Sequence, residues 1–374
     1  MKTYYIALVK LIILAGLLFF SVRAFSVDTI TVKCDHFDFT FNPQVIFREY
    51  NDSVFLFDKW THTIHVMDQK FACNRHFEVL DRTGEPFYAN DFCLENNKIY
   101  IYKDLAVYVL DLNGKRINFI GLNKRLNGDM YQIRHSSSGR RLFVMKGKLL
   151  FNSYVYPEVH ADNKLFLDPV MYEQGILTIY YLPKIPAANP DSLEMISPAE
   201  AIGTRNERYL KKDKFLPHLD ERNIYLDKSG RFYISEEADE QILILDQNGK
   251  KKGSFGVPGK YYITSPYWEY HTYSNNEAFW EAYKTRRAEA YRYSEIILDE
   301  KEQLCYRFYD GPRYSEEKYL QIYKNRKLIS DKAVNKDFNI FKAINGFVYS
   351  YEADPIKNEL RIYKINYAEL IPQN

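Results

Sequence analysis

The sequence predicts an all-β protein, and three observations support this. Aromatic residues make up 16% of the 374-residue chain, with 33 Tyr and 25 Phe, and such residues favour half-buried strands. A hydrophobic share of 46% is enough to bury a sizeable core. A pattern of apolar strand, polar loop and second apolar strand also recurs between residues 53 and 364.

The recurring strand pair indicates an internal repeat. Its six copies are SVFLFDKWTHTIHVMD (53–68), KIYIYKDLAVYVLD (98–111), KLFLDPVMYEQGILTIYYL (164–182), RFYISEEADEQILILD (231–246), LCYRFYDGPRYSEEKYLQIYK (304–324) and FVYSYEADPIKNELRIYK (347–364). The second strands end 43, 71, 64, 78 and 40 residues apart. Spacings near forty match one four-stranded blade, and the longer ones require insertions. We therefore expect a six-bladed β-propeller of antiparallel blades.

The remaining strands of a blade can be located beside these pairs. Asn-Gly turns follow the second and fourth copies and predict hairpins into RINFIG (116–121) and KGSFG (252–256). The segments NPQVIFREYN (42–51) and DFCLEN (91–96) supply innermost strands. We expect DTITVKC (28–34) or its neighbours to pair with the last blade, because closing the ring removes exposed edges.

The third copy departs from the pattern. The stretch RRLFVMKGKLLFNSYVYP (140–157) contains two further apolar segments. They fit either the inner strands of the third blade or a separate blade, so seven blades remain an alternative to six.

The first residues resemble an export signal. Lys2 and Lys10 precede an apolar run over 11–20, and Val22 with Ala24 gives a small-residue cleavage pattern. We expect a signal peptide over 1–24 and a single propeller domain over about 30–374, located in the periplasm or at the cell surface. The alternative is an uncleaved anchor, which would be the chain's one contact with a membrane.

Charge and cysteine content limit the partners. The formal charge is +2, and loss of the leader would leave 48 basic against 49 acidic residues, which gives no basic excess for nucleic acid. The four cysteines form no CxxC motif and have no His at metal-ligand spacing, so they indicate no metal site, and the sequence leaves any cofactor unknown. Four cysteines allow three disulfide pairings in an oxidising compartment, but Cys93 and Cys305 lie in apolar strands, which favours buried free thiols.

Two strings resemble blades of NHL-type and TolB-like six-bladed propellers: NKIYIYKDLAVYVLDLNGKRINFIG (97–121) and GRFYISEEADEQILILDQNGKKKGSFG (230–256). The whole chain resembles exported bacterial propeller proteins of unknown function, and RYSEIILDEKEQLCYRFYDGP (292–312) is similar to a segment of that uncharacterised group. The resemblance implies a fold and no particular activity, because enzymes, sensors and scaffolds all use this fold.

One face of such a propeller carries the loops between second and third strands together with the crossings between blades. These loops begin with Asp58, Lys103, Asp168, Glu236, Asp310 and Glu352. Five carboxylates around a channel predict an acidic ring for a cation or for a polyhydroxylated or amine-bearing ligand. The alternative is that each carboxylate only caps its own turn.

Two crossings are longer than a blade requires, 183–218 and 259–295. In the first, Ser197 and Pro198 are expected to open a short helix, and in the second, Ser274 and Glu277 form a capping box before a helix. Aromatic side chains here and in one loop fit either a platform for a glycan, small molecule or protein partner, or the packing of the insertion. These side chains are Trp60, Tyr267, Trp268, Tyr270 and Trp280.

No catalytic motif accompanies these features: the sequence has no Gly-x-Ser-x-Gly elbow, no phosphate-binding glycine loop and no His-Glu-x-x-His. We therefore expect an extracytoplasmic ligand- or partner-binding propeller. The alternatives are a metal-dependent lyase or hydrolase that uses the channel, and an assembly scaffold. The insertion from Gly259 to Glu295 should partly cover the working face, with Trp268 and Trp280 partly exposed near Glu236 and Asp310.

Overall fold

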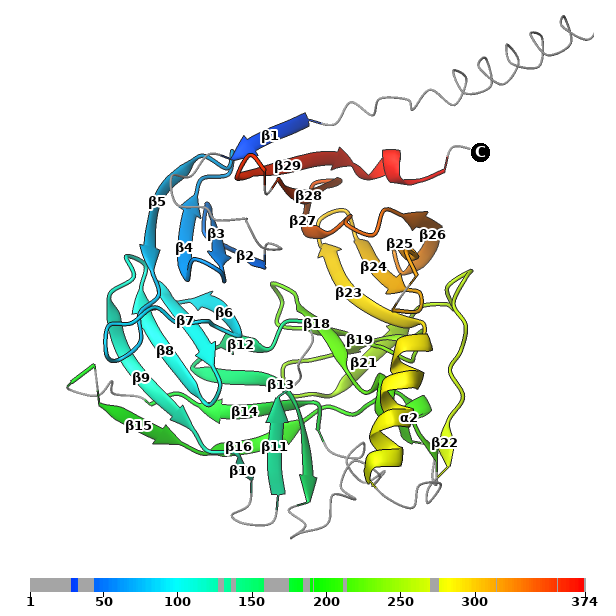
Figure 1. Ribbon diagram of the computed structural model, residues 1–374, viewed down its shortest axis with the longest axis horizontal. Coiled ribbons are helices and arrows are strands. Elements are labelled where there is room, and N and C mark those ends of the chain that lie inside the picture. The colour runs from blue at the N-terminus through cyan, green and yellow to red at the C-terminus, as the bar shows by residue number, and fades with distance from the viewer. Residues whose placement is uncertain are drawn as a thin grey trace, which may run out of the picture.

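Six four-stranded antiparallel sheets are arranged as the blades of a β-propeller around a central axis, in a computed structural model (Figure 1). The structure describes residues 28–32, 44–126, 131–135, 139–157, 175–183, 189–190, 192–210, 214–269, 276–313, 315–354 and 356–372. The predicted leader, 1–24, lies outside the described residues. No helix in these ranges is long and apolar enough to cross a membrane.

Each blade runs outward from an innermost strand. Blade 1 comprises β2 (Val45–Tyr50), β3 (Ser53–Asp58), β4 (Thr63–Met67) and β5 (Cys73–Glu78). Blade 2 comprises β6 (Asp91–Glu95), β7 (Lys98–Lys103), β8 (Ala106–Asp111) and β9 (Arg116–Leu122). Blade 3 comprises β12 (Leu142–Met145), β13 (Lys148–Pro157), β14 (Leu177–Tyr181) and β16 (Pro198–Ile202). Blade 4 comprises β18 (Arg222–Leu226), β19 (Phe232–Glu236), β20 (Ile242–Leu245) and β21 (Lys251–Phe255). Blade 5 comprises β23 (Arg292–Asp299), β24 (Leu304–Asp310), β25 (Lys318–Lys324) and β26 (Lys327–Val334). Blade 6 comprises β27 (Ile340–Ile344), β28 (Phe347–Asp354), β29 (Glu359–Asn366) and β1 (Asp28–Val32).

The ring closes as the sequence predicts. Strand β1 is the outermost strand of blade 6 and pairs antiparallel with β29, from Asp28 opposite Lys364 to Val32 opposite Leu360 (Figure 1). Val32 is buried with residues of blades 1 and 6. The N-terminal strand therefore joins the two ends of the chain through backbone hydrogen bonds and a shared apolar cluster.

Blade 3 corrects the third copy of the predicted repeat. Its second strand is β13 and not the apolar run at 164–167, which lies outside the described residues. The two extra apolar stretches in 140–157 are β12 and β13, joined by a two-residue turn in which Lys146 and Gly147 have φ of 50° and 76°. A Lys-Gly turn is a weaker sequence signal for a hairpin than Asn-Gly. Because this turn joins β12 to β13, both apolar stretches belong to blade 3, and the propeller has six blades and not seven.

The expected helix after Ser197 is wrong. Pro198–Ile202 is β16, the outer strand of blade 3, and Leu193–Ile196 is β15, which runs parallel to β9 at the outside of blade 2. This crossing therefore covers the edge of β9 in blade 2 and the edge of β14 in blade 3, and this pairing outweighs the local preference for a helix. Pro198 stands at the first position of its strand, where a missing N–H is tolerated.

The second insertion does contain a helix, α2 (Asn276–Glu289), which lies at the outside of the ring (Figure 1). Glu277 lies in its first turn, and Arg286 and Arg287 in its last, as the helix dipole favours. Ser274, the other half of the predicted capping box, lies outside the described residues.

Short elements complete the crossings. They are β10 (Arg125–Leu126) and β11 (Tyr131–His135), which extend β13; β17 (Lys214–Phe215) and β22 (Trp268–Glu269), which pair with each other; and the 3-10 helices Glu207–Leu210, Pro217–Leu219 and Tyr367–Leu370.

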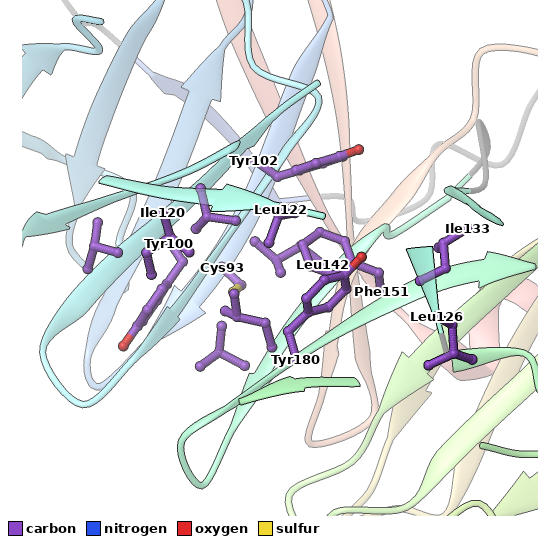
Figure 2. Close-up of a cluster of buried hydrophobic side chains, with 14 of the residues drawn as sticks. Cys93, Tyr100, Tyr102, Ile120, Leu122, Leu126, Ile133, Leu142, Phe151 and Tyr180 are labelled. Atoms are coloured by element: carbon purple, nitrogen blue, oxygen red, sulfur yellow. The ribbon is translucent and has the colours of Figure 1, made fainter. Parts of the chain in front are cut away.

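The core lies between neighbouring blades. Figure 2 shows the cluster in which Cys93 and Tyr102 of blade 2 lie toward Leu142 and Phe151 of blade 3, and the rings of Tyr102 and Phe151 meet edge to face at 5.0 Å. Cys93 and Cys305 are buried as expected, and burial raises the pKa of each thiol to about 12. Such thiols are poor nucleophiles at neutral pH.

The predicted Asn-Gly turns take a specific form. Asp246 Oδ1 accepts hydrogen bonds from the backbone N–H groups of Asn248 and Lys250, each 3.0 Å long. Only the glycine of this turn, Gly249, has positive φ, at 77°. The turn therefore depends on the aspartate as well as on the glycine.

Candidate functional site

A central channel is the main cavity formed by the innermost strands. It has a volume of about 600 Å³ and is lined by residues of β2, β6, β18, β23 and β27, together with 139–141 in front of β12. All six blades therefore contribute to its wall. A cavity of this size is sufficient for a small-molecule ligand.

Asp91 joins three blades at the channel wall. Its Oδ1 accepts hydrogen bonds from Arg48 Nη2 of blade 1, at 2.6 Å, and from its neighbour's amide, Phe92 N, at 2.8 Å. Its Oδ2 accepts from Arg141 N at 2.7 Å and from Leu142 N at 3.0 Å, both in blade 3. This buried carboxylate therefore fixes the relative positions of blades 1, 2 and 3.

Two further carboxylates of the channel are engaged by lysines. Glu49 forms an ion pair with Lys342 Nζ, which also donates a 2.7 Å hydrogen bond to Gln69 Oε1. Glu300 accepts the backbone N–H of Lys228, with distances of 3.1 and 3.2 Å to its two oxygens. These contacts hold the wall residues in place.

Arg140 differs from these residues. Its Nε donates to Leu142 O at 3.3 Å, and its guanidinium lies over the ring of Phe143, 4.7 Å from the centroid. It has no ion pair with any carboxylate of the described residues. Burial, with Arg48 adding to the effect, lowers the pKa of Arg140 to about 10, so the group is cationic at neutral pH.

Glu295 lines the opposite part of the ring, on β23. Its side chain is accessible to solvent in the channel, yet the surrounding protein raises the pKa of its carboxyl group, and Lys318 opposes this effect. Burial also raises the pKa of Tyr351 to about 12. Acidic and phenolic groups therefore stand in the same cavity as the arginines.

The loop positions predicted to form an acidic ring, as far as the structure describes them, do not line this cavity. Asp58 is buried, and its Oδ1 accepts Trp60 N at 2.9 Å, which is a turn cap. Glu236 is buried with Arg205, and its Oε2 accepts Asn206 N at 2.9 Å.

The other loop positions are also separate. Lys103 lies over the ring of Phe87 at 4.8 Å, and Glu352 is exposed and accepts a hydrogen bond from Tyr363. Asp310 is half-buried at the end of β24, and Asp168 lies outside the described residues.

The predicted aromatic platform is corrected at Trp268. Only 1% of its surface is exposed, because it stacks on His218 at 5.5 Å and meets Phe279 of α2 edge to face at 5.3 Å. The pairing of β22 with β17 places it beneath the helix, where packing decides its role. Trp280 is 36% exposed, Trp60 is 52% exposed and Tyr267 is half-buried, while Tyr270 lies outside the described residues.

The start of the same insertion is fixed to blade 5 by stacked tyrosines. Tyr262 stacks on Tyr293 at 4.3 Å, and Tyr261 stacks on Tyr319 at 4.8 Å. Gly259 N also donates to Tyr293 Oη at 2.9 Å. This part of the insertion is therefore held by packing against the propeller.

A smaller hollow of about 450 Å³ lies at the loop face of blade 4. It is lined by residues of the loop that follows Glu236, by residues 206–208, by Lys251 and Ser254 of β21 and by Tyr267. Arg208 covers the ring of Tyr267 at 5.6 Å. Of the predicted positions that lie in the described residues, only Tyr267 and the loop after Glu236 are brought together here.

The sequence interpretation missed the charged residues in or next to the innermost strands: Arg48, Asp91, Arg140, Glu295 and Lys342. Their one signal is a charge within a short, otherwise apolar strand, as in VIFREY and IFKAI. In the described residues, no group of three or more His, Cys, Asp or Glu side chains is arranged to hold a metal ion.

No family model and no curated protein matches this chain. Among solved structures it is similar to a DUF4221 family member from Bacteroides vulgatus, with a TM-score of 0.61 and 11% identity over 91% of this chain and 97% of the other. A candidate exported protein from Bacteroides fragilis gives 0.45 and 12% over 92% and 97%, and a streptogramin B lyase 0.42 and 11% over 92% and 100%. The first likeness shows the propeller fold alone, and the closer resemblance to NHL-type and TolB-like blades stays a prediction.

Proposed function

We propose that this protein is an exported binding propeller that holds a small ligand in its central channel. The observation that carries the proposal is the convergence of charged side chains from separate blades on one cavity of about 600 Å³. Ligand sites typically combine such a cavity with a few fixed polar groups that set the ligand's orientation. The ion pairs of Asp91 and Glu49 supply that fixed framework.

Export is the second part of the proposal, and the N-terminal pattern of basic residues, apolar run and small residues supports it. The periplasm or the cell surface would then be the place of action. Mass spectrometry of the mature N-terminus tests this, with a first residue after Ala24 expected. An intact Met1 in the cytosolic fraction would contradict export.

A ligand screen on a channel-blocked variant tests the binding site. Ala343 is a small residue of the channel wall that also packs against the cluster between blades 5 and 6, so a folded Ala343→Trp variant should narrow the cavity. We expect a compound from an array of sugars, amino acids, organic acids and nucleotides to raise the melting temperature of the parent protein and to leave this variant unchanged. Ala199→Trp, on the exposed outer strand β16, is the matched control and should respond like the parent.

A compound that stabilises the Ala343→Trp variant as well as the parent would contradict a channel site. The hollow beside Tyr267 would then be the next position to test, with Tyr267→Ala as the variant.

A further inference from the structure

The charged side chains of the channel are unequal in number. Six are cationic and four are acidic: Arg48, Lys59, Arg140, Arg141, Lys228 and Lys342 against Glu49, Asp91, Glu295 and Glu300. In a confined cavity with protein walls, such an excess raises the local concentration of oppositely charged ions. The balance therefore favours an anion in the channel.

Asp91, the carboxylate that pairs with Arg48, has no hydrogen-bond acceptor position left for Arg140. An ionised carboxylate offers about four acceptor positions. Those of Asp91 receive Arg48 Nη2 and Phe92 N at Oδ1, and Arg141 N and Leu142 N at Oδ2. Asp91 can therefore satisfy Arg48 but cannot also accept hydrogen bonds from Arg140.

Arg140 is consequently a cation that makes no ion pair within the described residues, although the charge of Asp91 acts on it electrostatically. Within the described residues its guanidinium makes a single hydrogen bond, from Nε to Leu142 O, so the two Nη groups make none. Phe143 supports one face of the group, and Arg48 lies close enough to act on it electrostatically. A guanidinium over an aromatic ring, with both Nη groups making no hydrogen bond within the described residues, can bind the two oxygens of a carboxylate or phosphate group.

We infer that the channel binds an anionic ligand, a carboxylate or a phosphate, through the Nη groups of Arg140 with Arg48 adding positive charge. The inference rests on the proposed function, since it names the ligand class of the same cavity. Lys59 lies in the same wall and would add to the attraction, whereas Glu295 would repel an anion on its own side of the channel. The ligand's charged group is therefore expected on the side of blades 1 to 3.

Titration calorimetry with citrate and, separately, with inorganic phosphate tests this inference, with sodium chloride at matched ionic strength as the reference. We expect saturable binding of at least one anion to the parent protein. Binding of citrate alone would identify a carboxylate ligand, and binding of phosphate alone a phosphate ligand. Arg140→Gln should weaken the binding roughly ten-fold or more, as expected for loss of hydrogen bonds to a charged group.

Arg82→Gln is the matched control, because Arg82 also lies over an aromatic ring, that of Phe119 at 5.2 Å, but is exposed outside the channel. It should bind the anion like the parent. Arg140→Lys keeps the charge and loses the planar fork, so its affinity should lie between those of the parent and Arg140→Gln. This second variant provides the measurement if Arg140→Gln does not fold.

A separate readout distinguishes a binding role from a structural one. Because burial and the charge of Arg48 both disfavour the Arg140 cation and no carboxylate pairs with it, Arg140→Gln should keep or raise the melting temperature of the ligand-free protein. Equal anion affinity in Arg140→Gln and the parent would overturn the inference, and so would the absence of binding by either anion. If only a neutral compound binds and Ala343→Trp abolishes that binding, the ligand class is wrong while the proposed function stands.

Discussion

Arg287 of helix α2 donates hydrogen bonds to both oxygens of the Glu237 carboxylate, each 3.0 Å long. Glu237 follows β19 of blade 4, so this pair ties the outer helix to the propeller. Arg287 also donates to His218 O at 2.6 Å, and the backbone oxygen of Glu237 accepts Tyr293 N at 2.9 Å. The insertion, blade 4 and blade 5 therefore meet at one buried residue, Glu237.

This carboxylate should make the stability of the protein depend on pH. Burial raises the pKa of Glu237 from 4.5 to about 7, with Arg287 opposing the rise. The folded state therefore binds a proton more readily than the unfolded state, and the stability this provides is complete below pH about 4.5 and lost as pH rises through 7. Denaturant titrations from pH 5 to 8 should show a falling free energy of unfolding, by up to about 1.4 kcal/mol per pH unit for this group.

Glu237→Gln removes the titrating group, so its free energy of unfolding should change less over the same pH range. Glu281→Gln, at an exposed position of the same helix, is the control and should follow the parent. Parallel pH profiles for Glu237→Gln and the parent would show that Glu237 does not titrate in this range.

The two tryptophans of the insertion should respond differently to truncation. Trp268→Ala removes a buried ring from between His218, Phe279 and Arg286, and should lower the free energy of unfolding by about 3 kcal/mol or more. Trp280→Ala removes a partly exposed ring and should lower it by about 1 kcal/mol or less. Thermal melts compare them, and equal losses would contradict the assignment of Trp268 to the core.

A glycine in the last turn of blade 4 should be irreplaceable for a packing reason. Gly249 has φ of 77°, and a Cβ there would lie 2.4 Å from the backbone nitrogen of Gly203, which follows blade 3. Gly249→Ala should therefore suffer both backbone strain and a clash, the clash adding about 1 to 3 kcal/mol. Gly84→Ala is the matched control, because Gly84 has φ of 87° in a similar turn with no atom within 4 Å.

Chemical denaturation of both glycine variants measures the difference. Gly84→Ala should show the strain alone, about 1 kcal/mol. If both variants lose the same free energy of unfolding, the close approach of Gly249 to Gly203 adds nothing to the cost of the substitution.

Closure of the ring should depend on the inward face of β1. Val32→Asp would place a charge in the apolar cluster between blades 1 and 6, and should lower the free energy of unfolding by about 3 kcal/mol or more. Thr31→Asp, on the exposed face of the same strand, should change it little. Denaturant unfolding is the measurement, and similar losses in the two variants would argue against the closing role of β1.

The sequence determined the local parts of this architecture. Alternating apolar and polar residues with Asn-Gly turns predicted the strand pairs, and their spacing near forty residues predicted four-stranded blades. The helix that contains Glu277 followed from an equally local signal, whereas the closing strand 28–32 was predicted because an open ring would expose strand edges. Such features are readable because hydrogen bonding and side-chain alternation within a hairpin involve residues close in sequence.

The tertiary structure alone decided the site. Arg48, Asp91 and Arg140 lie on three blades, and only the assembly of the blades into a ring brings them to one wall. Only the open edges of blades 2 and 3 explain why residues 193–202 form strands and not a helix. Trp268 is buried because α2 docks above it, which its own sequence neighbourhood does not encode. In each case a contact between residues distant in the chain decides the structure, because burial and charge pairing outweigh the local preference for one secondary structure.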